Sequence, residues 1–238
     1  MHRRTAVALM AGGTVAAGTV LVRARVSGRR TGKAVPDEDA VFTVFAPGGP
    51  QAFWCNGPGG WLMAKLIPSI EAGVYRSVAD MLDLRSDDDL LDIGCGPGAF
   101  MAAKAQHVSR VVGLDASPLM LRAAERRLAD RIAAGTAELV LGNAAKLPFG
   151  DALFTAATAI NAPASASEVF RVLRPAGRFV TVDPQPARTP TQSAVVSYGL
   201  RRMGEADHRR NLENAGFTDV EVSVDRAGLF ARGRKPTS

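Results

Sequence analysis

Three alternate glycines interrupt an apolar stretch near the middle of the chain. Residues 90–100 read LLDIGCGPGAF, so Gly94, Gly96 and Gly98 follow a strand-like run and precede a helix-like one. A side chain at these positions would block a ligand from touching the backbone, and the start of the helix offers free N–H groups and a positive dipole end. The pattern favours a nucleotide-type ligand, although such a loop alone does not identify one.

Two carboxylates narrow the chemistry of that ligand. Asp115 ends the next predicted strand, 21 residues beyond Gly94, where a carboxylate can accept both hydroxyls of a ribose in NAD enzymes and in S-adenosylmethionine enzymes alike. Asp92 stands just before the loop, where it would repel a pyrophosphate and attract an aminoacyl ammonium. The glycine spacing also differs from the G-x-G-x-x-G dinucleotide pattern, although Ala99 could replace its last glycine. We therefore expect a positively charged ligand, which disfavours NAD.

Asn143 is a third candidate for ligand contact. It follows the predicted third strand in the stretch LGNAAKLPF, and its amide could read the edge of an adenine. A Gly-Asn pair is also common in turns for steric reasons, and taken alone that interpretation is preferred. Among the histidines, His208 lies in the charged stretch EADHRR, which is predicted to be a solvated helix turn. The catalytic residues remain unknown from the sequence.

Alternating strand and helix patterns must position these residues. From residue 89 onward, short apolar runs alternate with segments of helical spacing, which indicates βαβ units and a parallel sheet. Strands are expected at 90–94, 110–115, 138–141, 154–160 and 178–183, with a closing pair at 220–224 and 228–232. Helices are expected at 70–84, 99–107, 118–134, 165–173 and 205–215. Ser117-Pro118 is a typical helix start, a cap followed by proline.

Composition and charge indicate one sizeable soluble domain and argue against a nucleic-acid partner. The 238 residues are 47% apolar and 22% charged, as in ordinary globular proteins. Residues 1–33 hold seven basic side chains and no acidic one, so subtracting those seven from the net charge of +6 leaves −1 for the rest. The body has no basic groove for a phosphate backbone. Cys55 and Cys95 are too few for a disulfide framework or a metal cluster, so no metal is expected, and Cys95 is predicted to be buried.

The N-terminal segment predicts a membrane anchor. Residues 5–22 form an uncharged run between Arg3-Arg4 and five basic residues that end at Lys33. The run is near the lower limit of about 20 residues for a spanning helix, and it lacks the small-residue site of a cleaved signal peptide. The positive-inside rule places the body in the cytoplasm, tethered to the inner face of the membrane. A twin-arginine export signal and a loosely structured start are the alternatives. Residues 34–65 are expected to form a linker and lead-in.

In combination, five segments resemble the class I S-adenosylmethionine-dependent methyltransferases, especially the type 11 group that includes ubiquinone and menaquinone enzymes. The segments are LLDIGCGPGAF, VVGLDASPLML, LGNAAKLPFGD, EVFRVLRPAGRFV and NLENAGFTDVEV, and they occur in the family's order over roughly residues 66 to 224. The resemblance implies a methyltransferase domain over residues 66–238 with an α/β, Rossmann-like fold. That fold is a seven-stranded, mostly parallel sheet with helices on both faces and an antiparallel last strand.

The resemblance also implies S-adenosylmethionine as the cofactor and a role for each matched position. The glycines would line its methionine and ribose portions, and the two aspartates would hold the amino-acid end and the ribose hydroxyls. The alanines and Asn143 would lie at the adenine, and Asn161 near the methyl group or the acceptor. The expected cofactor residues are Asp92, Gly94, Gly96, Gly98, Asp115, Ala116, Asn143, Ala144 and Asn161.

Three departures from the family pattern concern the later part of the chain. Thr155 stands where the family usually has aspartate, Ala176 replaces the first glycine of a Pro-Gly-Gly turn, and the chain is shortened between Ile160 and Glu168. The fourth-strand loop helps form the acceptor side of the pocket in the family. Cofactor binding is therefore better supported than turnover.

Three functions from different classes follow from these patterns. The leading one is methyl transfer to a small-molecule or lipid-like acceptor, by an in-line displacement for which the protein mainly aligns the reactants. The second is a catalytically weak S-adenosylmethionine-binding protein, suggested by the shortened loop. The third is an NAD-dependent oxidoreductase, which Asp92 and the lack of a Tyr/Lys pair for hydride transfer disfavour. The identity of the acceptor and the oligomeric state are not predicted.

Overall fold

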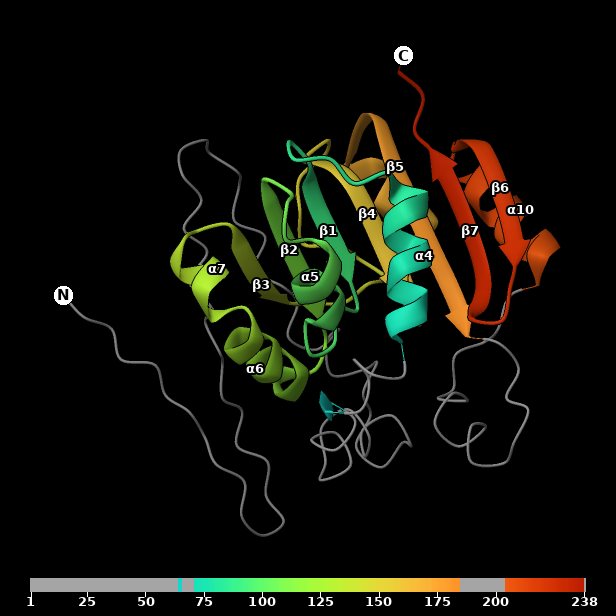
Figure 1. The fold of residues 1–238 in the computed structure, drawn as a ribbon. Coiled ribbons are helices and arrows are strands. Elements are labelled where there is room, and N and C mark those ends of the chain that lie inside the picture. The colour runs from blue at the N-terminus through green and yellow to red at the C-terminus, as the bar shows by residue number, and fades with distance from the viewer. Residues whose placement is uncertain (1–63, 66–70, 185–203, 238) are drawn as a thin grey trace, which may run out of the picture. The chain divides into compact units, whose positions relative to one another are not determined.

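The computed structural model describes residues 64–65, 71–184 and 204–237 (Figure 1). Within these residues, no helix is long and apolar enough to cross a membrane. The predicted anchor at residues 5–22 lies outside the described residues, as does nearly all of the predicted linker and lead-in.

Helices and strands alternate along the described part of the chain, as the sequence predicts. The helices are α4 (Ala72–Leu82), α5 (Ala99–Lys104), α6 (Pro118–Arg127), α7 (Ala129–Ala133), α8 (Ala166–Val172) and α10 (Glu205–Asn214). The strands are β1 (Asp89–Ile93), β2 (Arg110–Asp115), β3 (Ala137–Leu141), β4 (Phe154–Ile160), β5 (Leu173–Pro184), β6 (Thr218–Val224) and β7 (Gly228–Arg234).

The strands form one seven-stranded sheet in the order β3-β2-β1-β4-β5-β7-β6. Neighbouring strands from β3 through β5 run parallel, and β7 runs antiparallel to both β5 and β6. The order reverses between β1 and β4, and open α/β sheets bind ligands in the crevice outside the carboxyl ends of strands at such a switch point. The predicted Rossmann-like sheet, with its last strand antiparallel, is confirmed.

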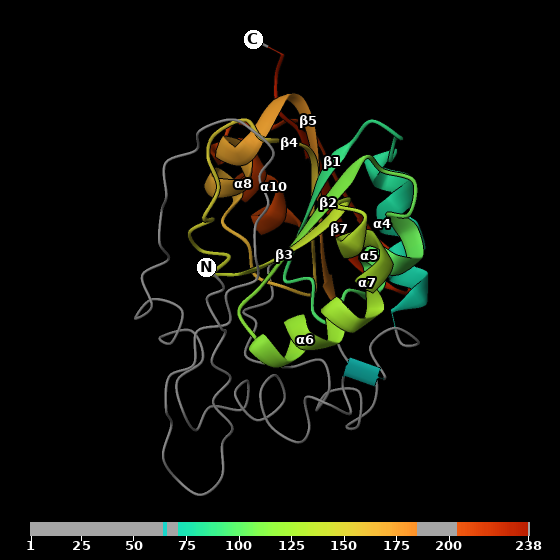
Figure 2. The same cartoon turned by 90° about the vertical axis from the view of Figure 1, so that its left-hand side faces the viewer.

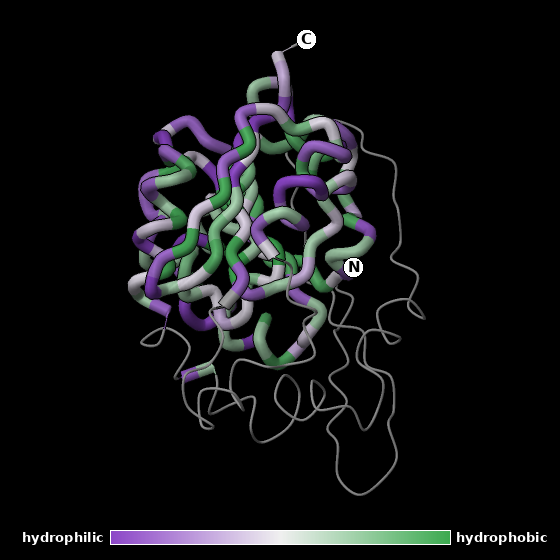
Figure 3. The backbone as a smooth tube through the Cα atoms, turned by 90° about the vertical axis from the view of Figure 1, so that its right-hand side faces the viewer, coloured by the Kyte–Doolittle hydropathy of each residue, from purple (hydrophilic) through white to green (hydrophobic). Residues whose placement is uncertain are grey.

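Helices cover both faces of the sheet, which explains why its inner strands are apolar almost throughout. Leu91 and Ile93 of β1 belong to a core shared with Val169 of α8 and Leu212 of α10. The opposite face is covered by α4 and α5, and Val78 of α4 is fully buried there. Figure 2 shows α8 and α10 on one side of the sheet and α4, α5 and α7 on the other. Figure 3 shows the hydrophobic residues gathered in the strands between these two layers.

Most predicted boundaries lie within three residues of those in the structure, and two elements differ more. The helix expected at 118–134 is interrupted at Leu128, so that α6 and α7 are separate; its predicted start is confirmed, since Ser117 accepts a hydrogen bond from the Met120 N–H at 3.2 Å. Strand β5 begins at Leu173 rather than at residue 178, because Leu173 pairs with Phe154 before a register shift. Within that shift Ala176 has a φ of 61°, a left-handed conformation that favours glycine.

Candidate functional site

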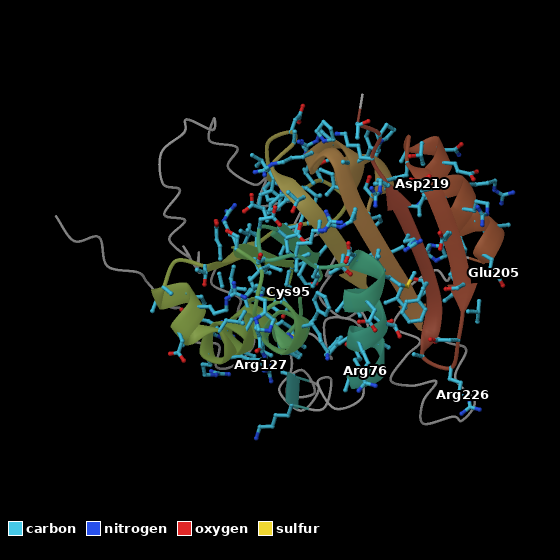
Figure 4. The ribbon with its side chains drawn as sticks, turned by 45° about the horizontal axis from the view of Figure 1, so that its top comes forward. Arg76, Cys95, Arg127, Glu205, Asp219 and Arg226 are labelled. Carbon is cyan, nitrogen blue, oxygen red and sulfur yellow. The ribbon has the colours of Figure 1, made fainter. Side chains whose placement is uncertain are left out.

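The glycine loop leaves the carboxyl end of β1 and is fastened to the neighbouring strand. The backbone N–H groups of Gly94 and Cys95 both donate to the carbonyl of Leu114, at 2.7 and 3.0 Å. Below the loop, Arg127 of α6 donates a hydrogen bond to the carbonyl of Pro97. Figure 4 shows Cys95 and Arg127 on neighbouring elements at this end of the sheet. The predicted strand–loop–helix unit is therefore present at the switch point of the sheet.

The three glycines are needed for different reasons. All three have positive φ angles, of 71°, 52° and 72°, which strain any residue with a Cβ. A Cβ at Gly94 would lie 2.3 Å from that of Ala162, and one at Gly98 would lie 3.0 Å from that of Ala124. A Cβ at Gly96 would meet nothing within 4 Å. Packing therefore requires Gly94 and Gly98, whereas Gly96 borders space that a ligand can enter.

Asp115 connects the two loops that follow β1 and β2. Its Oδ2 accepts from the Gly96 N–H and its Oδ1 from the Ser117 N–H, both at 2.8 Å. Burial raises the pKa of Asp115, and hydrogen bonds from the backbone N–H groups of Ser117, Gly96 and Ala116 oppose that rise. A carboxylate has about four acceptor sites, so these three bonds still leave capacity for a ribose hydroxyl. Asp115 and Ala116 are placed where the sequence predicts them, at the end of β2.

Asp92 is buried and incompletely paired. It is 2% exposed, and its Oδ2 has no hydrogen-bond partner among the described residues. Burial, followed by the charges of Asp115 and Glu71, raises its pKa to about 8. A buried carboxylate is costly unless it is paired. The arrangement fits a cationic ligand, as the position of Asp92 before the loop predicts.

Asn161 follows β4 and reaches across to the first described helix. It has a φ of 53°, and its side-chain amide donates to Glu71 Oε1 at 2.7 Å. Tyr75 donates to the other oxygen of Glu71 at 2.8 Å. Burial raises the pKa of Glu71, although both hydrogen bonds act against that rise. The sequence analysis did not find Glu71; the signal was its position four residues before Tyr75, on the buried face of α4.

Asn143 and Ala144 lie at the carboxyl end of β3, with ordinary loop contacts. The side-chain oxygen of Asn143 accepts from the Ala145 N–H at 2.8 Å, which is the geometry of an Asx turn. The carbonyl of Ala144 accepts from the Ser165 N–H at 3.3 Å. The turn interpretation of Asn143 is confirmed, and its contact with adenine stays a prediction.

The prediction that His208 belongs to a solvated helix turn is wrong. His208 is 2% exposed, and its Nε2 lies 2.9 Å from Oδ2 of Asp183, near the carboxyl end of β5. The reason is that His208 and Leu212 lie one turn apart on the buried side of α10, while the charged neighbours of His208 remain exposed.

Cys95 is buried, as predicted, and the described residues contain no group of histidine, cysteine or acidic side chains suited to a metal ion.

Comparisons with known proteins agree with this geometry. Residues 90–177 match the family model described as "Methyltransferase domain". The chain is 34% identical over 119 residues to a demethylmenaquinone methyltransferase of Symbiobacterium thermophilum, covering 46% of this chain and 47% of that protein. It is 37% identical over 123 residues to the nocamycin O-methyltransferase of Saccharothrix syringae, covering 48% and 44%.

A solved structure with a bound cofactor product has the same fold. Geranyl diphosphate C-methyltransferase from Streptomyces coelicolor, in complex with Mg²⁺, geranyl diphosphate and S-adenosyl-L-homocysteine, matches 69% of this chain and 79% of its own. The TM-score is 0.57 at 17% identity. The switch-point loop and this fold define a Rossmann-like, S-adenosylmethionine-type domain. The chain belongs to the class I S-adenosylmethionine-dependent methyltransferases. It spans less than half the length of the curated relatives named here.

Proposed function

We propose that this chain transfers a methyl group from S-adenosylmethionine to a small-molecule or lipid-like acceptor. The observation that carries the proposal is the unpartnered carboxylate of Asp92 beside the open space at Gly96. The amino-acid end of the cofactor carries an ammonium, and a buried carboxylate with an unpaired oxygen is the group that such a cation stabilises. NAD would bring a pyrophosphate to the same place and would be repelled.

The residues of the site divide the work of holding the cofactor. Asp92 would face the amino-acid end, Asp115 would accept the ribose hydroxyls, and the backbone at Gly96 would border the ligand. When bound, the cofactor supplies an electrophilic methyl group on a sulfonium, and transfer requires an acceptor in line with the carbon–sulfur bond. Asn161, fixed by the hydrogen bond that its side-chain amide donates to Glu71, would lie on the methyl side.

The chemical class of the acceptor is drawn from relatives. Their printed names include a demethylmenaquinone methyltransferase, a 24-methylenesterol C-methyltransferase and a nocamycin O-methyltransferase. These names refer to a menaquinone precursor, a sterol and nocamycin, which supports a small or lipid-like molecule here. The proposed anchor at residues 5–22 would bring the enzyme to the inner face of the membrane, where a lipid-like acceptor would be met.

The shortened segment between β4 and α8 supports a second candidate function. Strand β4 ends at Ile160 and α8 begins at Ala166, which leaves a five-residue connection on the acceptor side. A domain with an intact cofactor site and a reduced acceptor side would bind S-adenosylmethionine with little turnover. The two functions share the cofactor and differ only in methyl transfer.

Calorimetry followed by an acceptor screen tests both candidates. We expect the full chain to bind S-adenosylhomocysteine and to give no heat with NAD; binding of NAD alone would overturn the assignment. S-adenosylmethionine is then incubated with quinol, phenol and sterol acceptors, and methylated products are sought by mass spectrometry. Product formation supports the enzyme, whereas cofactor binding without product from any acceptor supports the binding protein.

A further inference from the structure

Three carboxylates from three different elements gather near the glycine loop; Asp92 is buried, and Glu71 and Asp115 are partly buried. Glu71 stands at the start of α4, Asp92 lies in β1 and Asp115 ends β2. Their charges influence one another, since those of Asp115 and Glu71 both act on Asp92. Within the described residues, none of the three forms a salt bridge. Ionisation of all three would place an excess of negative charge here, which is unfavourable unless a cation binds.

The three carboxylates differ in how their oxygens are used. Asp115 is held by backbone N–H groups, and Glu71 is held by Tyr75 and Asn161. One oxygen of Asp92 has no partner among the described residues, and neither has the side-chain oxygen of Asn161. The unused oxygen of Asp92 belongs to that carboxylate itself. The unused oxygen of Asn161 lies beside Glu71, because the amide of Asn161 donates a hydrogen bond to Glu71. Unused buried acceptors of this kind indicate a ligand that donates hydrogen bonds.

The ligand that would donate hydrogen bonds to these acceptors is an organic cation rather than a metal ion. Among the described residues, no group of three acidic, histidine or cysteine side chains is arranged to hold a metal. An ammonium carries three donors and one positive charge, so it can bond to several acceptors at once. A single carboxylate accepts only some of the three N–H donors of an ammonium. A second carboxylate nearby would accept the others.

We propose that Glu71 is this second carboxylate and binds, together with Asp92, the ammonium of the cofactor's amino-acid part. The inference rests on the function proposed above and extends the cofactor site to helix α4. Tyr75 and Asn161 then act as positioning residues, because their two hydrogen bonds fix both oxygens of Glu71. This part of the site depends on the hydrogen bond between Asn161 and Glu71, which are 90 positions apart in the sequence.

The test compares two ligands that differ only in the ammonium. S-adenosylhomocysteine carries it, and the deaminated analogue of S-adenosylhomocysteine keeps the carboxylate without it. Glu71→Gln preserves the size of the side chain and removes its charge. Asp80→Asn removes one charge from an exposed position of the same helix and serves as the matched control. Binding of both ligands to the full chain is measured by calorimetry, with thermal melting as the check on folding.

We expect Glu71→Gln to weaken S-adenosylhomocysteine roughly ten- to hundredfold, the loss typical of one charged hydrogen bond. Affinity for the deaminated analogue should stay the same or rise, and Asp80→Asn should change neither ligand. Equal weakening of both ligands, or no weakening, would overturn the role of Glu71. If Glu71→Gln does not fold, Glu71→Asn, which also removes the charge, is measured with the same two outcomes. Failure of the unmodified chain to bind either ligand would refute the proposed function itself, a different pattern.

Discussion

Two buried aspartates at opposite ends of β1 differ in the partners of their carboxylate oxygens. Asp88 and Asp92 are each 2% exposed. At the amino end, one oxygen of Asp88 accepts from Arg178 at 2.5 Å and from the Arg85 N–H at 2.7 Å, and the other from the Thr155 hydroxyl at 2.6 Å. At the carboxyl end, one oxygen of Asp92 has no partner among the described residues. Asp88 is therefore paired with Arg178 within the protein, whereas Asp92 keeps an oxygen that a ligand can bind.

This difference separates a structural region from a functional one within a single strand. Arg178 also donates to the carbonyl of Leu82 at 2.7 Å, so the network around Asp88 fixes the end of α4 to β5. Thr155, one of the departures from the family pattern noted in the sequence, belongs to that network. The departure at Thr155 therefore lies at the end of the sheet away from the glycine loop and leaves the cofactor side untouched.

The largest expected effect is on stability at the amino end. Asp88→Ala leaves the buried guanidinium of Arg178 without its carboxylate, and breaking a buried pair in this way typically costs about 3–5 kcal/mol. Urea unfolding should show that loss, with the exposed Asp87→Ala as a control that changes the unfolding free energy little. A loss below about 1 kcal/mol for Asp88→Ala would mean that the network contributes no more than a surface ion pair.

Asp92→Asn should have the opposite effect on stability while it damages binding. The pKa of Asp92 is about 8 in the folded protein, above the value of about 3.9 for an unfolded chain, so this carboxyl lowers stability progressively as pH rises from about 4 to about 8. At pH 8.5 the amide should raise the unfolding free energy by an amount on the order of 1 kcal/mol, or roughly 2–4 °C in Tm. Cofactor affinity should fall about tenfold or more, from loss of a charged partner. A variant that is destabilised would show that Asp92 is already paired.

The affinity for S-adenosylhomocysteine should increase with pH below 8. Asp92 must lose its proton to bind the ammonium, so affinity should rise by up to about tenfold between pH 6 and pH 7. Calorimetry across this range provides the measurement, and Asp92→Asn should flatten the slope. An affinity that is constant from pH 6 to 7 would contradict a protonated Asp92 in the free protein.

The smallest expected effect concerns the backbone at the amino end of β5. Ala176 has a φ of 61°, so Ala176→Gly should stabilise the protein by about 1 kcal/mol through relief of a left-handed conformation. The same substitution at Ala123, inside α6, should cost about 1 kcal/mol. Thermal melting of both variants gives the comparison. Equal shifts of the same sign would mean that Ala176 is not strained.

Local patterns were sufficient to predict the strand–loop–helix unit and its acidic partner. The order of apolar runs, the alternate glycines and the Ser117-Pro118 cap depend on residues close together in the sequence, and each is found where it was expected. The position of Asp115 at the end of β2 was predicted from the same pattern of apolar residues, because that pattern marks where a strand and the helix before it begin and end. The membrane anchor also rests on local composition, but its residues lie outside the described part of the chain.

Only the tertiary structure decided which polar groups are buried and with whom they pair. His208 lies in a charged stretch of the sequence and Glu71 among mostly apolar residues, and only packing places one against Asp183 and the other against Asn161. The left-handed φ of Ala176 and the position of β7 between β5 and β6 depend on contacts with distant segments as well. Such contacts join residues far apart in the chain, and a hydrogen bond across 90 positions leaves no periodic trace in the sequence. The physical reason is that burial depends on what packs on top of a residue, which neighbours in the sequence do not specify.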